Sequence, residues 1–466
     1  MARPNVLVIV LDTARADALE PYGAAPGTTP ALAQLASSGR AYPDVHSTAC
    51  WTMPSHASMF TGLLPRAAGL NRAPGEMPTG CRPVLEAAAD RLLPEVLRHA
   101  GYRTRGVSSN IWVAEASGFA TGFDEWRDVT PNRAAQMVST RLRPRARWAL
   151  DALRARSDDG AAAAAEVLRE WFADAGDQPD FWFVNLIECH SPYLPPKPFN
   201  DLGPLDRLRA AEEARRHLTL GEIWRVCVSD FDVPEPALQR MRHLYDRSIR
   251  QLDAWVAQTL TALDEAGRLD DTLVLICSDH GENFGEGGLL GHAYSLDERL
   301  LHVPFIASGP NPPEDVRSLV ELPRVVADAV GLEDHPWDRE GPTVAVAEFD
   351  SPGTHDDPRK LDAIQAWGAG PEALDNLNAM MECAVQGTTK LLRRNGELQL
   401  YDLAADPLEE RPRVVRPGEA PADLLAALDG QTSGPVVAAP GETDAPTASA
   451  EELARIEEQM RTLGYL

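Results

Sequence analysis

The sequence contains very little lysine and carries a strong negative charge. Lysine occurs only at Lys197, Lys360 and Lys390 among 466 residues, and the formal net charge is -26. Nucleic acids and anionic membrane surfaces both attract proteins that present clustered positive charge. The composition therefore argues against nucleic acid and against a membrane surface as a partner.

Long hydrophobic runs and paired cysteine motifs are also absent. The apolar run near the start covers residues 5–11 and ends before Asp12, which is too short to span a bilayer, and no small-residue cleavage site follows it. The six cysteines show no CxxC spacing, and several lie in apolar runs, as buried free thiols do. We therefore expect a cytoplasmic protein without a disulfide framework.

Short apolar runs that alternate with helical patterns predict the fold class. The strand candidates are residues 5–11, 181–187, 272–277 and 303–307. Helical patterns lie between them, including residues 85–101 and 235–267. This alternation is typical of an α/β fold with a mixed, mostly parallel central sheet sandwiched by helices.

A change of sequence texture near residue 335 predicts two domains. Residues 1–335 would form the larger domain, with a helical insertion at about 130–250. Residues 336–466 would form a smaller C-terminal α+β subdomain whose antiparallel strands turn at Asn395-Gly396.

The end of this subdomain has a composition of its own. Residues 412–448 are rich in Pro, Gly, Ala and Thr, which predicts a loop or partly disordered linker, and residues 449–463 follow as a terminal helix.

Polar residues follow the predicted strands, at the edge where open α/β sheets place their ligand sites. Asp12 follows the first strand, His190 lies just beyond the second, and Asp279 and His280 follow the third within "SDHGE". An aspartate and a histidine side by side, with a third ligand from another strand and a hydroxyl, are typical of a divalent metal site.

The stretch "STACWTMPSHASMFTG", residues 47–62, offers two candidate nucleophiles, Cys50 and Thr52. Pro54 can stand in the first turn of a helix, which would leave Thr52 at the positive end of the helix dipole. Alternate residues of an extended lead-in face the same side, so facing alone does not decide between the two.

Several segments together resemble the sulfatase-like family of the alkaline phosphatase superfamily over nearly the whole chain. They are "NVLVIVLDTARAD", "TTPALAQLASSG", "TMPSHASMFTGLLP", "AGYRT", "HSPY", "LDDTLVLICSDHGE", "GHAYSLDERLLHVPFI" and "LQLYDLAADPLEE". The resemblance implies the α/β fold of that family and a metal-dependent hydrolase of ester bonds.

The family's nucleophile stands two residues before the proline of a Cys/Ser-x-Pro-Ser-Arg motif, which implies Thr52 here and leaves Cys50 as a buried thiol. The implied metal ligands are Asp12, the Thr52 oxygen, Asp279 and His280, around one divalent ion: Mn, Zn, Ca or Mg. Thr13 replaces a second aspartate ligand of the family and is a doubtful ligand.

The sequence departs from the family's sulfate-binding pattern at three places. His56 replaces the motif's arginine, Ser108-Ser109-Asn110 replaces the Gly-Lys-Trp of sulfatases, and His292 stands at the position of a later lysine. We expect Asn110 and His56 to contact the substrate. His190 or His292 would protonate the leaving group.

A threonine nucleophile also bears on whether the substrate is an ester of sulfur or of phosphorus. A formylglycine hydrate releases sulfate by collapsing, whereas threonine has no second hydroxyl on the same carbon and can only form a simple ester. Hydrolysis of that ester needs a second in-line attack, as in phosphatases and phosphodiesterases, which favours phosphoester, phosphodiester or phosphonate ester substrates.

Three alternatives stay open: a sulfatase without formylglycine, a phosphoryl-group transferase, and a non-catalytic anion-binding homologue. The expected partner is a small anionic ester, and an oligomer is possible.

Overall fold

The computed structural model describes most of the chain, and the statements below refer to that part. The described residues are 3–73, 77–129, 144–228, 232–292, 294–338, 340–351, 357–370, 372–430, 456–457 and 460.

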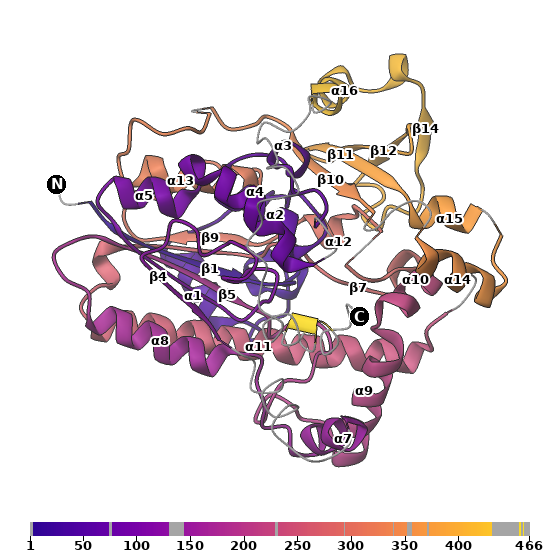
Figure 1. Ribbon diagram of the computed structural model, residues 1–466, viewed down its shortest axis with the longest axis horizontal. Helices are drawn as coiled ribbons and strands as arrows, with labels where there is room; N and C mark the ends of the chain where they lie inside the picture. The colour runs from indigo at the N-terminus through magenta and orange to yellow at the C-terminus, as the bar shows by residue number, and fades with distance from the viewer. Residues whose placement is uncertain are drawn as a thin grey trace.

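A seven-stranded sheet forms the centre of the structure (Figure 1), in the order β2-β9-β6-β1-β5-β3-β4. Its strands are β1 (Asn5–Leu11), β2 (Arg40–Ala41), β3 (Arg103–Ser108), β4 (Glu125–Asp128), β5 (Asp180–Leu186), β6 (Thr272–Cys277) and β9 (Phe305–Ser308). β1 pairs in parallel with β5 and β6, and β3 pairs in parallel with β5 and β4. β9 runs antiparallel to β6, and β2 runs antiparallel to β9.

Helices cover both faces of this sheet, and β1 shows why its sequence is an unbroken apolar run. Its valines pack into the hydrophobic core on one face, and Leu7, Ile9 and Leu11 pack into the core on the other, because successive side chains of a strand alternate. Figure 1 shows α2, α5 and α13 on one side, and α8 and α11 on the other. The covering helices are α1 (Pro30–Ser38), α2 (Thr52–Thr61), α4 (Arg82–Ala87), α5 (Leu93–His99), α8 (Ala161–Ala173), α11 (Glu235–Glu265) and α13 (Leu322–Ala329).

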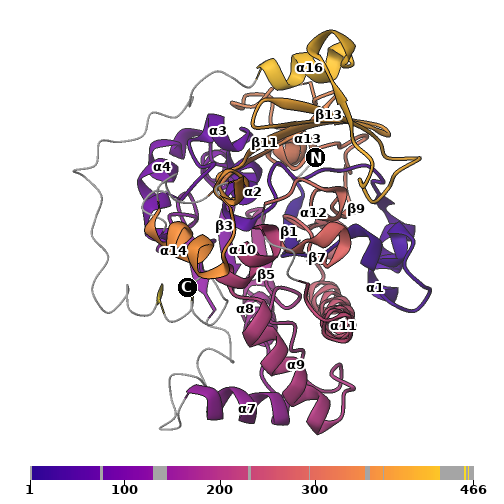
Figure 2. The ribbon, with the colours of Figure 1, turned by 90° about the vertical axis from the view of Figure 1, so that its right-hand side faces the viewer.

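The predicted helical insertion at 130–250 is not continuous. β5 lies inside this range and occupies an inner position of the central sheet, because the apolar run of 181–187 is buried on both faces. Figure 2 shows α7 (Pro144–Arg154) and α9 (Pro204–His217) below the sheet, where they form an excursion. α10 (Leu220–Val228) follows α9 and packs against α15 (Glu372–Leu377).

A second sheet of five antiparallel strands follows, in the order β10-β11-β12-β13-β14. Its strands are β10 (Ala345–Asp350), β11 (Met380–Gln386), β12 (Thr389–Arg394), β13 (Glu397–Asp402) and β14 (Arg413–Val415). Asn395 and Gly396 join β12 to β13 with φ of 48° and 89°, as the predicted hairpin turn requires. The fold class is confirmed, with a small C-terminal antiparallel sheet beside the larger one. The domain boundary near residue 335 stays a prediction.

Several smaller elements complete the fold, and two of them, α12 and the hairpin of β7 and β8, lie beside the site. The smaller elements are α3 (Pro65–Ala68), α12 (Glu298–Leu301), α14 (Pro358–Trp367), α15 (Glu372–Leu377), α16 (Ala422–Asp429) and the short hairpin β7 (Asn283–Phe284) with β8 (Leu290–Gly291). Among the described residues, no helix has both the length and the apolar character needed to cross a membrane.

Two local predictions need correction. The helix expected at 85–101 is divided, because Leu92 is extended and Pro94 restarts a helix in its first turn. The first part of the 412–448 loop is structured, since it contains β14 and α16, whose Leu424 and Leu428 are buried against the second sheet. The rest of that loop and most of the predicted helix 449–463 lie outside the described residues.

Candidate active site

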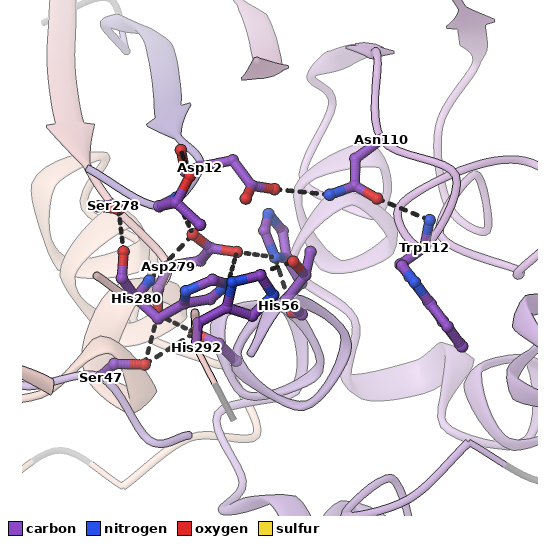
Figure 3. A network of polar contacts seen from close by, with 12 residues as sticks. Asp12, Ser47, His56, Asn110, Trp112, Ser278, Asp279, His280 and His292 are labelled. Carbon is purple, nitrogen blue, oxygen red and sulfur yellow. Dashed lines mark hydrogen bonds and ion pairs between the residues drawn. The ribbon is translucent and has the colours of Figure 1, made fainter. Parts of the chain in front are cut away.

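The ends of two central strands and the start of one helix bring the predicted metal ligands together (Figure 3). Asp12 follows β1, Asp279 and His280 follow β6, and Thr52 is the first residue of α2; all four are fully buried. One ligand atom each from Asp12, Asp279 and His280 lies within 4.8 Å of the others. The structure therefore places these three predicted ligands in one cluster, with the Thr52 hydroxyl 3.3 Å from His280 Nε2.

The carboxylates of this cluster fit a divalent cation. Asp12 Oδ1 and Asp279 Oδ2 are buried oxygens without a hydrogen-bond partner. Burial raises the pKa of Asp12 to about 6, although the Asn110 amide opposes the change. Burial and the neighbouring Asp12 raise the pKa of Asp279 well above its usual range. Two buried acids that disfavour each other's charge need a positive charge between them, and two carboxylates with an imidazole are a donor set that divalent metals accept.

Hydrogen bonds fix the orientation of the ligand side chains. His280 Nδ1 lies 2.9 Å from the Gly281 carbonyl, which can only accept, so Nδ1 carries the proton and Nε2 is left as a ligand atom. Asp279 Oδ1 accepts from the main-chain N–H groups of His280 (2.9 Å) and Thr13 (3.1 Å). Asp279 Oδ2 is thereby left to face the cluster.

Thr13 contributes to the site through its main chain and not through its side chain. Its φ of 63° places a branched residue in the left-handed region, which is strained. Its hydroxyl donates to the Asp12 carbonyl at 2.6 Å. Thr13 therefore serves Asp279 through its main-chain N–H, with its side chain engaged elsewhere.

Cys50 and Thr52 lie in different surroundings. Cys50 is fully buried in an apolar cluster that includes Ala347 and Cys383 of the second sheet. Burial raises the pKa of its thiol, which keeps it protonated. The lead-in at residues 48–51 bends instead of running extended, so the expected alternation does not apply.

Asn110 and His56 both contact the ligand groups. The Asn110 side-chain amide donates to Asp12 Oδ2 at 2.7 Å, and its oxygen accepts from the main-chain N–H of Trp112 at 2.8 Å. His56 Nδ1 lies 2.9 Å from the Thr52 carbonyl and 3.5 Å from Asp279 Oδ2. Their predicted contact with substrate stays a prediction, and the structure gives each of them a role in holding the cluster.

The ring of His56 is enclosed by aromatic side chains. It packs edge-on against Phe119 and Phe183, and its Nε2 is buried without a partner. Burial lowers its pKa to about 3, so the imidazole is neutral at ordinary pH. The positive charge of the family's arginine is therefore not reproduced at this position.

His292 and His190 lie beside His280. The ring centroid of His292 is 4.6 Å from that of His280 and 4.9 Å from that of His190. The hairpin of β7 and β8 pairs Asn283 with Gly291, which brings the preceding Glu282 next to His292. His292 Nδ1 is 3.1 Å from Glu282 Oε1, so Nδ1 donates to the carboxylate and Nε2 is the nitrogen left for the site.

The two histidines hold protons differently. Burial and the neighbouring His292 lower the pKa of His190 to about 4. Burial also lowers the pKa of His292, but the Glu282 and Asp12 carboxylates outweigh it, and the net pKa is raised. His292 is therefore the better proton donor of the two.

Sequence reasoning missed the residues that support this group. Glu282 is fully buried, and its Oε2 accepts from the Tyr193 hydroxyl at 2.7 Å. Glu282 belongs to the motif "SDHGE" and Tyr193 to "HSPY", but neither motif indicates that the two side chains pair. Glu188, which follows β5, instead accepts from the Ala161 N–H at the start of α8 at 2.6 Å.

Comparison with known proteins identifies the family of the chain. The sequence matches the family described as Sulfatase over residues 4–327. Choline-sulfatase of Rhizobium meliloti (strain 1021) is 30% identical over 283 residues, which cover 52% of this chain and 48% of that protein. Ulvan-active sulfatase of Formosa agariphila is 26% identical over 337 residues, which cover 66% of this chain and 48% of that protein. The chain thus spans about half the length of these two curated relatives.

Solved structures share the fold. Phosphonate monoester hydrolase of Agrobacterium radiobacter superposes with a TM-score of 0.63 at 19% identity, covering 88% of this chain and 91% of that chain. At this identity the likeness concerns the fold alone.

Proposed function

We propose that this chain, which belongs to the sulfatase family of ester-bond hydrolases, cleaves phosphoester, phosphodiester or phosphonate ester bonds through a covalent Thr52 intermediate. The observation that carries the proposal is the position of Thr52. Its hydroxyl lies 3.3 Å from His280 Nε2 beside two buried carboxylates, at the N-terminus of α2.

Asp12, Asp279, His280 and the Thr52 hydroxyl would together hold a divalent ion: Mn, Zn, Ca or Mg. Such an ion, when bound, lowers the pKa of a hydroxyl and neutralises charge on the oxygens of the reacting group. Thr52 stands at the N-terminus of α2, the positive end of the helix dipole, which would favour an anion beside it.

In the first step the Thr52 hydroxyl gives up its proton to solvent water, Oγ1 forms a bond to phosphorus, and the bond from phosphorus to the leaving oxygen breaks. Protonated His292 would donate its Nε2 proton to that oxygen, while Glu282 holds Nδ1. His190 is the weaker candidate because its pKa is lowered to about 4 by burial.

In the second step His292 acts as a base and accepts a proton. A water molecule would transfer a proton to the now neutral Nε2 and attack phosphorus, and the bond from phosphorus to Thr52 Oγ1 would break. Thr52 Oγ1 then takes a proton back from solvent, which regenerates the alcohol, and the acid product leaves. An acceptor alcohol in place of water would make the enzyme a transferase.

Sulfate ester hydrolysis is the second candidate, and the names of the curated relatives favour it. The residues of this chain favour phosphorus, since the arginine and the two lysines with which sulfatases bind sulfate are missing. His56 and His292 replace the arginine and one lysine, and Ser108-Ser109-Asn110 replaces the segment that holds the other. Threonine also lacks the second hydroxyl that lets a formylglycine hydrate release sulfate. Non-catalytic anion binding is the third candidate.

A substrate panel tests the choice. Aryl phosphate, bis-aryl phosphate, aryl phosphonate and aryl sulfate esters would be assayed with the metal-free protein supplied with Mn, Zn, Mg or Ca. We expect a phosphodiester or phosphonate ester to give the highest kcat/KM. Faster turnover of the aryl sulfate would favour the sulfatase alternative, and no turnover of any ester would favour the non-catalytic one.

We also propose a cytoplasmic location. Among the described residues, Cys50, Cys81, Cys189, Cys277 and Cys383 are all free thiols, which suits a reducing compartment. Fractionation of cells that produce the full chain would test this, and recovery outside the cytoplasm would contradict it.

A further inference from the structure

Lys390 is one of only three lysines in the chain, and it lies fully buried in β12 of the second sheet. Its Nζ donates to the Leu296 carbonyl and lies 3.1 Å from Glu298 Oε1 and 2.8 Å from Glu409 Oε2. Burial lowers the pKa of Lys390, but the two glutamates outweigh it and the net pKa is raised, so the ammonium stays charged.

Glu298 also contacts the residue before the nucleophile segment, which is residues 47–52. Its Oε2 lies 2.8 Å from His46 Nε2, and His46 directly precedes residues 47–52, the segment that ends at Thr52. Leu296 and Glu298 belong to residues 292–298, the segment that begins at His292. One ammonium group is therefore tied to both segments that supply the proposed nucleophile and proton donor.

The second sheet also contacts the nucleophile segment directly. The main-chain N–H of Glu348 in β10 donates to the Thr48 carbonyl at 2.9 Å. Cys50 packs in the same cluster as Ala347 and Cys383 of this sheet. The sheet that holds Lys390 therefore lies against residues 47–52.

A buried ion group of this kind is a weak source of stability, because desolvation offsets much of the attraction. Its geometry is specific, however, because the compact ammonium has to meet a carbonyl and two carboxylates at once. Such a group is suited to fixing the relative position of the segments that it joins.

We propose that Lys390 is a positioning residue. Acting through Glu298 and His46, it fixes the position of residues 47–52, which end at Thr52, relative to residues 292–298, which begin at His292. Its effect on turnover rests on the proposed function, whereas its effect on the two segments does not. Misplacement of reacting groups by about 1 Å can lower a rate by about 100-fold.

The chain offers a matched control. Lys360 of α14 is also a buried lysine beside the second sheet, and its Nζ bonds Ser351 Oγ at 3.1 Å and Asn378 Oδ1 at 2.8 Å. Lys390→Met and Lys360→Met would each replace a buried ammonium by an apolar chain of similar length.

Hydrogen exchange followed by mass spectrometry tests the positioning directly. In Lys390→Met we expect amides of residues 46–52 and 292–298 to exchange at least tenfold faster, and in Lys360→Met we expect these amides to match the unmodified protein. Unchanged exchange in both segments of Lys390→Met, or the same increase in Lys360→Met, would overturn the proposal. This readout stays valid even if no ester is hydrolysed, so it separates a failure here from a failure of the proposed function.

Kinetics give the second readout. For the best ester, we expect Lys390→Met to lower kcat by about 10- to 100-fold with KM changed less than about threefold, because the reacting groups move while the binding surface stays. Glu298→Gln should give a similar loss, and the double variant little more than either, because both substitutions break one chain of contacts. Additive losses, or a change confined to KM, would overturn the proposal. If Lys390→Met does not fold, Glu298→Gln, which hardly changes shape, carries both tests alone.

Discussion

Asn110 gives the sharpest test of how the metal ligands are held. Its side-chain amide donates to Asp12 Oδ2 at 2.7 Å in a fully buried site, so Asn110→Ala would leave that oxygen without this partner. A hydrogen bond to a charged group contributes about 1.5–3 kcal/mol, and about 1.4 kcal/mol corresponds to a factor of ten in affinity. We therefore expect the dissociation constant for the divalent metal to rise about 10- to 100-fold.

The same substitution should raise the pKa of Asp12 further above its present value of about 6, because the bond to Asn110 opposes the effect of burial. Metal binding by competition with a chromophoric chelator, at pH 7 and at pH 8, would measure the loss. At saturating metal, kcat should recover most of its value, since the ligands themselves are intact.

Asn200→Ala is the control, because Asn200 is also buried and its oxygen accepts from the Leu202 N–H at 3.3 Å, in a loop that supplies none of the ligands. Unchanged metal affinity in Asn110→Ala, together with a raised KM, would refute this reasoning. The amide of Asn110 would then serve the substrate, as its place in the sequence first suggested.

Three further predictions concern the same site. The pKa of Asp12 is about 6, so protons compete with the metal below that pH. Calorimetry should therefore show the affinity for the divalent metal falling from pH 7 to pH 5, and a constant affinity would contradict this. His56→Asn, which can keep a donor at the place of Nδ1, should retain more kcat than His56→Gln, whose amide reaches the place of Nε2; the reverse order would assign His56 to the substrate. Asp279→Ala should hold no divalent ion after chelation and show no activity, and normal metal content by elemental analysis would remove Asp279 from the ligands.

The sequence allowed the central sheet and the metal cluster to be predicted for the same physical reason. Strands buried on both faces are continuous apolar runs, as in β1 and β6, and a charged residue directly after such a run marks the strand end. The sequence alone therefore predicts Asp12, Asp279 and His280 at one edge of the sheet, where the structure brings them together.

Other strands and contacts are not visible as a local pattern in the sequence. β3, with the sequence RTRGVS, contains two arginines and a glycine, and it is buried because Arg105 pairs with Asp180 and stacks near Trp171. Such compensation depends on residues distant in the chain, so no local pattern predicts it. The pairing of Glu282 with His292 and that of Lys390 with Glu298 escaped prediction for the same reason.

The central claim is that Thr52, and not Cys50, becomes covalently attached to the substrate. Enzyme quenched in acid during turnover of the best ester would be digested with trypsin, which releases both residues in the single peptide 41–66, and fragment masses would locate the added group. We predict a phosphoryl or phosphonyl adduct on Thr52, a loss of several orders of magnitude in kcat for Thr52→Ala, and near-normal turnover for Cys50→Ser. An adduct on Cys50, or a Thr52→Ala variant with near-normal kcat, would contradict the account.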